Sequence, residues 1–357
     1  MKKSYLIIYV LVVLLYSCSK NSTDAAPLIE DTFVRAADVS YLPLIESEGI
    51  IYKHNGQSEN ALITLKNAGC NTIRIRLWKN PIDGHSGLAE VKALSLRAKN
   101  LGMKVWLTVH YSDTWADPAN QNKPAEWASL SFTNLKNAVS SYTATIMNEI
   151  DPDIIQIGNE TNDGMLWPDG RISSNEEHYL ELVQSAVSSI RSISPSTKIM
   201  LHYAGVDSGS TLFFSKVTAI DYDYIGLSYY PIWHGNNLSN VTNAINLVGQ
   251  TYNKKVLIAE TAYPFTLSWN DWTNNIVGLD NQLIPAFPAS NSGQKSFVLA
   301  IKNALKQSNF GQGFCYWGAE WVAFRGTQST NGSSWENQAL WDFNNNSLPV
   351  MDAFNQN

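Results

Sequence analysis

The sequence predicts an α/β fold, a single (β/α)8 barrel with its active site at the C-terminal ends of the strands. Eight short apolar segments alternate along the chain with segments of helical periodicity, which is the pattern of a parallel sheet with crossover helices. The 357 residues suffice for such a barrel, which takes about 250 residues before insertions. No glycine-rich phosphate loop follows the first predicted strand, and this disfavours an open dinucleotide-binding sheet.

The predicted strands and helices follow one another in regular order. Strands are expected at 34–39, 72–77, 104–110, 154–158, 198–202, 224–228, 256–260 and 313–317. Helices are expected at 60–68, 88–101, 135–150, 174–193, 238–252 and 294–307. The fourth of these helices opens on a capping-box pattern, because Glu177 follows Ser174 by three residues, and Pro195 stands just past its end.

The first residues predict export rather than a part of the barrel. Lys2 and Lys3 precede an apolar run, so residues 1–17 are predicted to be a signal peptide. The run Leu15-Tyr16-Ser17-Cys18 resembles a bacterial lipobox and predicts lipidation of Cys18; a plain signal peptide with an incidental cysteine is the alternative. Residues 18–32 then form a polar tether and 33–357 the catalytic domain. We expect anchoring to the outer membrane at the cell surface of a Gram-negative bacterium, with the periplasmic face left open.

Composition and charge narrow the classes of partner. Hydrophobic residues make up 44% of the chain and charged residues 16%, which supplies one large core. The formal net charge is −6 and no run of Lys or Arg is present, so no nucleic acid partner is expected. Cys70 and Cys315 fall at the second and eighth predicted strands, so we expect no disulfide between them, and no Cys/His cluster has zinc-ligand spacing.

Two glutamates mark the predicted active site. Polar and aromatic residues gather where the predicted strands end, and the fourth strand ends in Glu160 and the seventh in Glu260. Two carboxylates about 5–5.5 Å apart hydrolyse a glycoside with retention, one as the nucleophile and the other as the acid/base. The acid needs a pKa raised by burial or by the neighbouring carboxylate. The pair therefore predicts a retaining glycoside hydrolase.

Other side chains at the same rim suit sugar binding. Arg76 is the expected cationic neighbour of the ionised nucleophile. Asn159 is expected to donate a hydrogen bond to the sugar 2-hydroxyl, and His110 to bind a sugar hydroxyl rather than a metal. Tryptophans at strand ends and in loops offer flat apolar faces to sugar rings: Trp78, Trp115, Trp233, Trp317, Trp321 and Trp335.

An ordered set of motifs resembles glycoside hydrolase family 53. The set consists of Ala37-Asp-Val-Ser40, Ile73-Arg-Ile-Arg-Leu-Trp78, His110-Tyr-Ser-Asp-Thr-Trp-Ala-Asp-Pro118, Ile157-Gly-Asn-Glu160, Gly226-Leu-Ser-Tyr-Tyr-Pro231, Glu260-Thr-Ala-Tyr-Pro264, Trp317-Gly-Ala-Glu-Trp321 and Ser333-Ser-Trp-Glu-Asn-Gln-Ala-Leu340. The resemblance covers about residues 33–349. Each tripeptide alone is weak, but the ordered set is specific.

The resemblance implies endo-hydrolysis of β-1,4-galactan, a side chain of pectin, with net retention. Matched residue by residue, it makes Glu160 the acid/base and Glu260 the nucleophile. It also places Arg76, His110, Asn159, Tyr229 and Trp317 around the cleaved sugar. The full substrate-binding set that we predict is Arg76, His110, Asp113, Trp115, Asn159, Tyr229, Trp233, Trp317 and Trp335.

Calcium and the identity of the sugar stay open at this point. Some bacterial members that resemble this chain carry an acidic calcium loop after the Glu-Thr-Ala-Tyr-Pro motif, whereas here Asp271 and Asp280 are the only acids in that stretch. Calcium usually takes several carboxylates, so the loop does not support it; no organic cofactor is required. The rival interpretations are another β-1,4-glycanase, acting on mannan, xylan or cellulose, and a non-catalytic surface glycan-binding lipoprotein.

Overall fold

The computed structural model describes residues 32–356. The predicted signal peptide and Cys18, with the tether as far as residue 31, lie outside the described residues. Within the described part, no helix is both long enough and apolar enough to cross a membrane.

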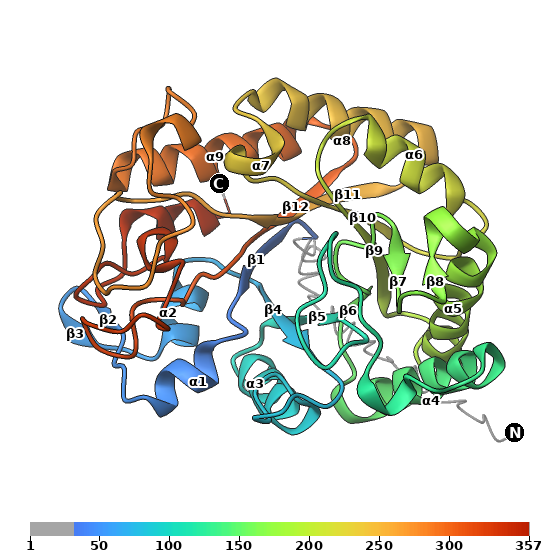
Figure 1. Cartoon of the computed structure of the whole chain (residues 1–357). Helices are drawn as coiled ribbons and strands as arrows, with labels where there is room; N and C mark the ends of the chain where they lie inside the picture. The colour runs from blue at the N-terminus through green and yellow to red at the C-terminus, as the bar shows by residue number, and fades with distance from the viewer. Residues whose placement is uncertain (1–31, 357) are drawn as a thin grey trace, which may run out of the picture. The chain divides into compact units, whose positions relative to one another are not determined.

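Eight parallel strands close into a barrel, as the sequence predicts. In chain order they are β1 (Val34–Asp38), β4 (Thr72–Leu77), β5 (Lys104–Val109), β6 (Ile154–Ile157), β9 (Lys198–Ala204), β10 (Tyr224–Ser228), β11 (Lys255–Thr261) and β12 (Gly311–Tyr316). Each strand pairs with the next in this order, and β12 pairs with β1 (Figure 1). The predicted (β/α)8 barrel is confirmed.

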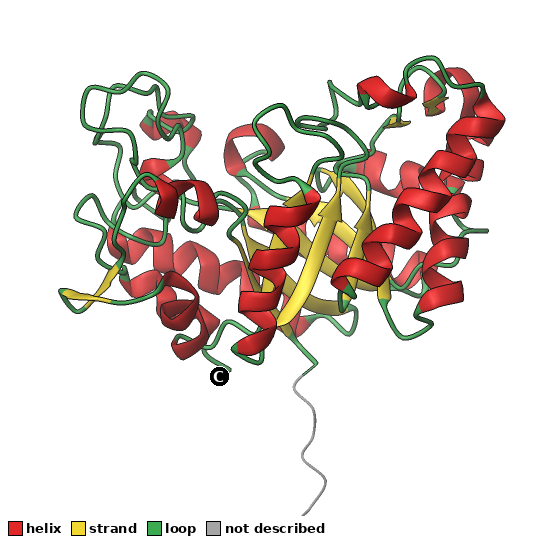
Figure 2. Cartoon of the chain, turned by 90° about the horizontal axis from the view of Figure 1, so that it is seen from below, coloured by secondary structure: helices red, strands yellow, loops and turns green. Residues whose placement is uncertain are grey.

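Helices surround the barrel and short elements decorate its loops (Figure 2). The helices are α1 (Leu42–Ser47), α2 (Ala61–Asn67), α3 (Leu88–Asn100), α4 (Phe132–Ile150), α5 (Ile172–Ile193), α6 (Ser208–Lys216), α7 (Pro231–His234), α8 (Leu238–Tyr252) and α9 (Asn291–Gln307). Two-residue strands form the hairpins β2–β3 (Lys53–His54, Gln57–Ser58) and β7–β8 (Gly164–Met165, Gly170–Arg171). Short 3-10 helices occupy Ala125–Trp127, Asp280–Gln282, Glu336–Gln338 and Pro349–Phe354. The sequence did not predict α1, α6 or α7.

The start of α5 corrects the predicted capping box. Asn175, not Ser174, has a non-helical backbone within this helix, with φ −158° and ψ 84°. Its side-chain oxygen accepts from the backbone N–H of His178 at 3.2 Å, which is how an N-cap satisfies a free donor. Ser174 instead donates to the carbonyl oxygen of Arg171. The regular helix therefore begins after Asn175, one residue later than the Ser174–Glu177 pattern predicts.

The barrel strands separate an inner apolar layer from an outer one, because side chains alternate across each strand. In β4, Ile73, Ile75 and Leu77 belong to the outer layer, which packs against the helices. Arg74 and Arg76, on the other face of the same strand, line the cavity at the barrel mouth. The inner layer consists of Val34, Ala36, Trp106, Ile154, Met200, Leu257, Ala259 and Cys315.

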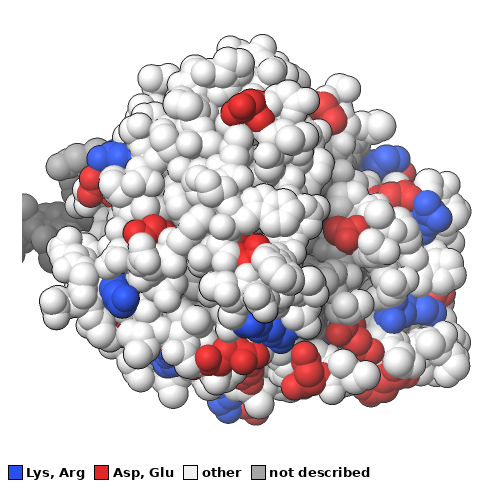
Figure 3. Space-filling model, turned by 60° about the vertical axis from the view of Figure 1, so that its left-hand side comes forward, with Lys and Arg blue, Asp and Glu red and all other residues white. Residues whose placement is uncertain are grey.

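Cysteine pairing and surface charge agree with the sequence. Cys70 and Cys315 are both free and buried, so the prediction of no disulfide between them is confirmed. The face drawn in Figure 3 is mostly uncharged, and its acidic and basic side chains are interspersed. That face carries no basic patch of the kind that binds a phosphate backbone.

Candidate active site

A cavity of about 660 Å³ opens where the barrel strands end. Its floor is polar and charged, whereas the barrel interior beneath it is apolar. Much of the polar lining comes from six strands or the loops that directly follow them, and includes Asp38, Arg74, Arg76, His110, Asn159, Glu160, Tyr230 and Glu260. Aromatic and apolar walls rise above this floor, formed by Trp115, Trp233, Ile276, Trp317, Trp321 and Trp335.

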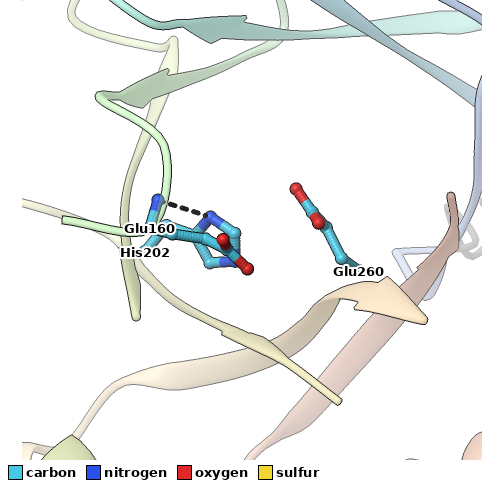
Figure 4. A group of neighbouring side chains, drawn as sticks. All are labelled: Glu160, His202 and Glu260. Atoms are coloured by element: carbon cyan, nitrogen blue, oxygen red, sulfur yellow. Dashed lines mark hydrogen bonds between the residues drawn. The ribbon is translucent and has the colours of Figure 1, made fainter. Parts of the chain in front are cut away.

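The two predicted glutamates face each other across this cavity. Glu160 follows β6, and Glu260 lies in β11 on the other side of the barrel mouth (Figure 4). One oxygen of each carboxylate and a ring nitrogen of His202 all lie within 4.8 Å of one another. This separation suits a pair in which one carboxylate attacks and the other transfers a proton.

A β-bulge turns Glu260 into the cavity. Leu257 and Ala259 already belong to the inner apolar layer, so strict alternation would send Glu260 outward. The register of β11 against β10 shifts here: Leu227 pairs with Ile258, but the next residue, Ser228, pairs with Glu260. The extra residue in β11 bends the strand, and Glu260 therefore faces inward directly after Ala259.

Glu260 is held by one cation and one hydroxyl. Arg74 Nη2 lies 2.7 Å from Glu260 Oε1, and the Tyr230 hydroxyl donates to Oε2 at 3.0 Å. Arg74 Nη1 also pairs with Asp38 at 2.7 Å. Burial raises the pKa of Glu260, while the charge and hydrogen bond of Arg74 and the hydrogen bond of Tyr230 oppose that rise. These two partners stabilise the ionised form that a nucleophile needs.

Glu160 is held by a hydroxyl, and no Lys or Arg within residues 32–356 is paired with its carboxylate. The Ser228 hydroxyl donates to Glu160 Oε1 at 2.5 Å. Burial, and then the negative charge of Glu260, raise the pKa of Glu160 to about 8. A carboxyl group with this pKa is protonated at neutral pH and can act as a general acid.

The backbone before Glu160 turns sharply to aim its side chain. Gly158 has φ +74° and Glu160 φ +47°, a left-handed conformation that is costly for a residue other than glycine. A Cβ at Gly158 would lie 2.4 Å from Cγ2 of Thr161, so only glycine fits there. The Glu160 N–H donates to Nδ1 of His202 at 3.2 Å and holds the turn in place.

The predicted cationic neighbour of the nucleophile is corrected from Arg76 to Arg74. Arg76 lies two residues further along β4, and its guanidinium bonds to Ser86 and His85 instead. It stacks over the rings of Tyr41, Trp78 and Trp115 at 4.1–4.6 Å. Arg76 still lines the cavity, so its predicted contact with substrate stays a prediction.

Tyr230, and not the predicted Tyr229, lines the cavity. Ser228, at the end of β10, faces inward to Glu160, so the next side chain faces away from the cavity. Tyr229 is accordingly fully buried and donates to the carbonyl oxygen of Gly235. Tyr230 faces inward again and reaches Glu260.

Asp113 braces a loop and does not line the cavity. One of its carboxylate oxygens accepts from the N–H of Asn80 at 2.9 Å, and the other from the N–H of Ala125 at 2.8 Å. Both oxygens are therefore used to join the loops after β4 and β5. Asp113 is absent from the residues that line the cavity, and its contact with substrate stays a prediction.

The remaining predicted substrate-binding residues do line the cavity: His110, Trp115, Asn159, Trp233, Trp317 and Trp335. His110 Nδ1 accepts from the N–H of Ala116 at 3.0 Å, and burial holds the pKa of His110 well below its usual range. The ring is therefore neutral and carries its proton on Nε2. Asn159 uses part of its amide, because its Nδ2 donates to the Ala116 carbonyl at 2.9 Å.

Sequence reasoning missed four residues that contact the two glutamates: Arg74, His202, Ser228 and Tyr230. Arg74 and Ser228 lie in the strand motifs that carry the family resemblance. The available signal was the alternation along each strand, which places residues two apart on one face. His202 lies in β9, a strand for which the sequence offered no motif.

In the Glu160–His202–Glu260 group, His202 has no nitrogen left over for a metal ion. Both ring nitrogens of His202 are hydrogen-bonded, Nδ1 to the Glu160 N–H and Nε2 to the Ser228 hydroxyl. Arg74 is paired with one oxygen of Glu260. A cation here would displace this pairing and meet the guanidinium charge, so we assign the group to proton transfer and nucleophilic attack.

The loops after β11 and β12 meet at a second, buried polar cluster. Glu336 Oε1 accepts from the N–H groups of Asn270 and Asp271. Three buried oxygens have no hydrogen-bond partner among the described residues: Glu336 Oε2, Asn275 Oδ1 and Asn337 Oδ1. Oxygens of this kind suit calcium, so these residues with Asp271 would hold such an ion. There it would tie the two loops together and take no part in bond cleavage.

Known proteins of one family resemble this chain. Residues 34–354 match the family described as Glycosyl hydrolase family 53. An arabinogalactan endo-beta-1,4-galactanase of Cellvibrio japonicus is 36% identical over 341 residues, which cover 90% of each chain. An endo-beta-1,4-galactanase of Bacillus subtilis is 30% identical over 372 residues, covering 90% of this chain and 85% of the relative.

Solved structures show the same relationship. The GH53 catalytic domain of Ignisphaera aggregans matches with a TM-score of 0.86 at 36% identity, covering 92% of this chain and 97% of that one. A structure described among two fungal beta-1,4-galactanases matches with a TM-score of 0.80 at 31% identity, covering 91% and 99%. Because the family match spans nearly every described residue, this chain belongs to glycosyl hydrolase family 53.

Proposed function

We propose that this protein is a retaining endo-β-1,4-galactanase that cleaves the galactan side chains of pectin. The observation that carries the proposal is the carboxylate pair, with one oxygen of each residue within 4.8 Å of the other across the cavity. An inverting enzyme separates its carboxyl groups by about 6.5–9.5 Å to admit a water molecule, and this pair is closer. The relatives named as endo-beta-1,4-galactanases support β-1,4-galactan as the substrate.

The surroundings of each glutamate support its role. Glu260, ionised beside Arg74, attacks the anomeric carbon and forms a covalent glycosyl–enzyme ester. Glu160 gives its proton to the leaving glycosidic oxygen, so the first product departs as a neutral sugar. Glu160, now ionised, takes a proton from the water that attacks the same carbon and releases Glu260. Two inversions at that carbon give net retention.

The cavity walls support binding of a sugar chain. Trp317 packs edge-on against Trp335 with ring centroids 4.8 Å apart, and Trp115 lies 6.0 Å from Trp317. Trp233, at the outer end, is 55% exposed although it lines the cavity. A large apolar ring left exposed at a cavity suits the C–H face of a sugar. The Nε2–H of His110 is available for a sugar hydroxyl.

Hydrolysis of a panel of polysaccharides tests this function. The barrel domain is incubated with β-1,4-galactan, galactomannan, xylan and carboxymethyl-cellulose, and reducing ends and product lengths are followed over time. We expect reducing ends from galactan only, with an early spread of oligosaccharide lengths that shows internal cleavage. Activity on another polymer would keep the mechanism and change the substrate. Release from none of the four, with the protein folded, would favour a glycan-binding protein.

We propose further that the protein is exported and anchored by a lipid on Cys18. The charged and then apolar order of the first residues and the lipobox-like run support this proposal. Labelled palmitate should enter the wild-type protein in a bacterial host, and Cys18→Ala should stay unlabelled. Protease treatment of intact cells would then separate an outer-surface location, in which the protein is cleaved, from a periplasmic one, in which it is protected.

A further inference from the structure

His202 accepts two hydrogen bonds on the same ring nitrogen. The backbone N–H of Glu160 lies 3.2 Å from His202 Nδ1, and the side-chain amide nitrogen of Gln156 lies 2.9 Å from it. A backbone N–H can only donate. The Gln156 nitrogen is also assigned as a donor, because it lies 3.0 Å from the carbonyl oxygen of Gly158, which can only accept. His202 Nδ1 therefore carries no proton.

The other ring nitrogen must then carry the proton. His202 is fully buried, and burial with the nearby charge of Arg74 holds its pKa well below the usual range. The neutral ring has one N–H, and this group is on Nε2, which lies 2.9 Å from the Ser228 hydroxyl oxygen. Ser228 accepts this bond, and its own proton is directed to Glu160 Oε1 at 2.5 Å.

The fixed direction of these two hydrogen bonds, from His202 to Ser228 and from Ser228 to Glu160, decides which oxygen of Glu160 holds the acidic proton. Because Oε1 always receives the Ser228 hydrogen, a protonated Glu160 must carry its own proton on Oε2. We propose that His202, acting through Ser228, is a positioning residue that keeps the transferable proton of Glu160 on Oε2, the oxygen free to serve the substrate. His202 also holds the backbone of Glu160 in its left-handed turn.

The opposite tautomer would misplace the proton. With the hydrogen on Nδ1, the Ser228 hydroxyl would donate to Nε2 and accept from Glu160 Oε1. The acidic proton would then point into the protein and away from the cavity. The Glu160 N–H and the Gln156 amide prevent this arrangement, because a protonated Nδ1 would face two donors without an acceptor. The inference rests on the proposed role of Glu160 as acid/base and adds the device that orients it.

Other charged and titratable groups lie around the hydrogen-bonded chain His202–Ser228–Glu160, which we call the relay. These groups could also shift the pKa of Glu160. Those that face the relay come from several elements: Glu260 from β11, Arg74 from β4, Asp117 after β5, and Tyr230 and His234 after β10. None of them is hydrogen-bonded to Ser228. A variant of Ser228 therefore changes the donor to Glu160 and leaves these charges in place.

Nitrogen-15 NMR of the imidazole tests the tautomer without any substitution. The folded wild-type protein, labelled at histidine, is titrated between about pH 5 and pH 8, the range in which an ordinary histidine changes charge. We expect His202 to stay neutral with its proton on Nε2 throughout. A proton on Nδ1, or an imidazolium in this range, would overturn the proposal. Assignment uses His202→Asn, from which the resonances of this ring disappear.

Three substitutions separate the two roles of His202, which are to accept the Glu160 N–H on Nδ1 and to donate to Ser228 from Nε2. Ser228→Ala removes the donor to Glu160, and the alkaline limb of kcat/KM should move up by about one pH unit, since a bond to a carboxylate stabilises its ionised form. His202→Asn keeps an acceptor near the Nδ1 position and loses the Nε2 donor, so it should move the limb in the same direction. His202→Gln keeps a donor near Nε2 and should leave the limb near its wild-type position.

The choice of substrate distinguishes orientation from general damage. With galactan, Ser228→Ala should lose about tenfold in kcat/KM, the equivalent of one hydrogen bond to a charged group. With an aryl galacto-oligosaccharide whose leaving group needs no proton, the loss should stay within about twofold. Ser189→Ala, which removes a buried serine hydroxyl that bonds to Ser140 far from the cavity, controls for stability and should change neither limb nor rate.

An unmoved alkaline limb in both Ser228→Ala and His202→Asn would overturn the relay, as would equal losses on the two substrates. The proposed function fails separately, if the wild-type protein does not cleave galactan. In that case the nitrogen-15 tautomer still decides whether His202 directs the Ser228 hydrogen to Glu160.

Discussion

The two sides of the barrel mouth hold the same functional group in opposite ways. On the β11 side, Glu260 is 2.7 Å from a guanidinium and 3.0 Å from a phenol. On the β6 side, Glu160 is 2.5 Å from a neutral hydroxyl, and in the described part of the chain no cation is hydrogen-bonded to its carboxylate. Both carboxyl groups line the same cavity, and they differ in the partners that hold them.

This difference explains how one site obtains a proton donor and an ionised nucleophile from two identical side chains. Burial raises the pKa of both glutamates. Arg74 opposes that rise at Glu260, whereas the negative charge of Glu260 adds to the rise at Glu160. By favouring the ionised form of Glu260, Arg74 thus helps to keep Glu160 protonated.

Replacing each glutamate in turn gives the largest expected contrast. Glu260→Gln should lose roughly 10⁴-fold or more on every substrate, because no glycosyl–enzyme ester can form. Glu160→Gln should lose roughly 10²- to 10⁴-fold on galactan, as expected for a missing general acid. On an aryl substrate with a good leaving group, Glu160→Gln should retain most of its kcat/KM. Equal losses for both variants on that aryl substrate would contradict the two roles.

Weakening the interaction of Arg74 with Glu260 should make the environments of the two glutamates more alike. Arg74→Lys keeps a charge but loses the planar fork that spans Asp38 and Glu260. The pKa of Glu260 should then rise, so the acid limb of kcat/KM should move to higher pH. At pH values below that limb, kcat/KM should be roughly 10²-fold lower than in the wild-type protein. Arg76→Lys is the matched control: it should raise KM and leave the acid limb in place. An acid limb that moves only in Arg76→Lys would restore the original sequence-based assignment.

Substitutions of the two neighbouring tyrosines after β10 compare a side chain that lines the cavity with one that is buried away from it. Tyr230→Phe removes a hydrogen bond to the Glu260 carboxylate, for which we expect a roughly ten- to hundredfold loss of kcat/KM. Tyr229→Phe removes a bond to the Gly235 carbonyl instead. It should lower stability by about 1 kcal/mol and leave kcat/KM within about twofold. Thermal denaturation and steady-state rates on galactan measure both effects, and the reverse pattern would contradict the assigned geometry.

The pH profile of the wild-type protein should report the two sides directly. Glu160 must be protonated to assist the leaving group, and its pKa is about 8. The kcat/KM on galactan should therefore fall about tenfold for each pH unit above about 8. An aryl substrate with a good leaving group should show no such fall near this pH. A decline on both substrates with the same midpoint would point to another group or to unfolding.

Much of this molecule could be predicted because the relevant patterns are local. The strands at 72–77 and 224–228 match β4 and β10 in full, since apolar periodicity and the turns that interrupt it lie within a few residues. The two glutamates were found because a pair of carboxylates at strand ends has a specific chemistry. The helix start at Ser174 was missed by one residue, because Asn175 competes for the same capping role.

The sequence by itself determined the barrel, the order of its strands and the two candidate catalytic glutamates. Only the tertiary structure decided that Arg74 rather than Arg76 pairs with Glu260, that Tyr230 rather than Tyr229 faces the cavity, and that His202 contacts Glu160. The physical reason is that the direction of a side chain at a strand end depends on the register with neighbouring strands. At Glu260 a bulge against β10 reverses the alternation, and no pattern within β11 alone records that shift.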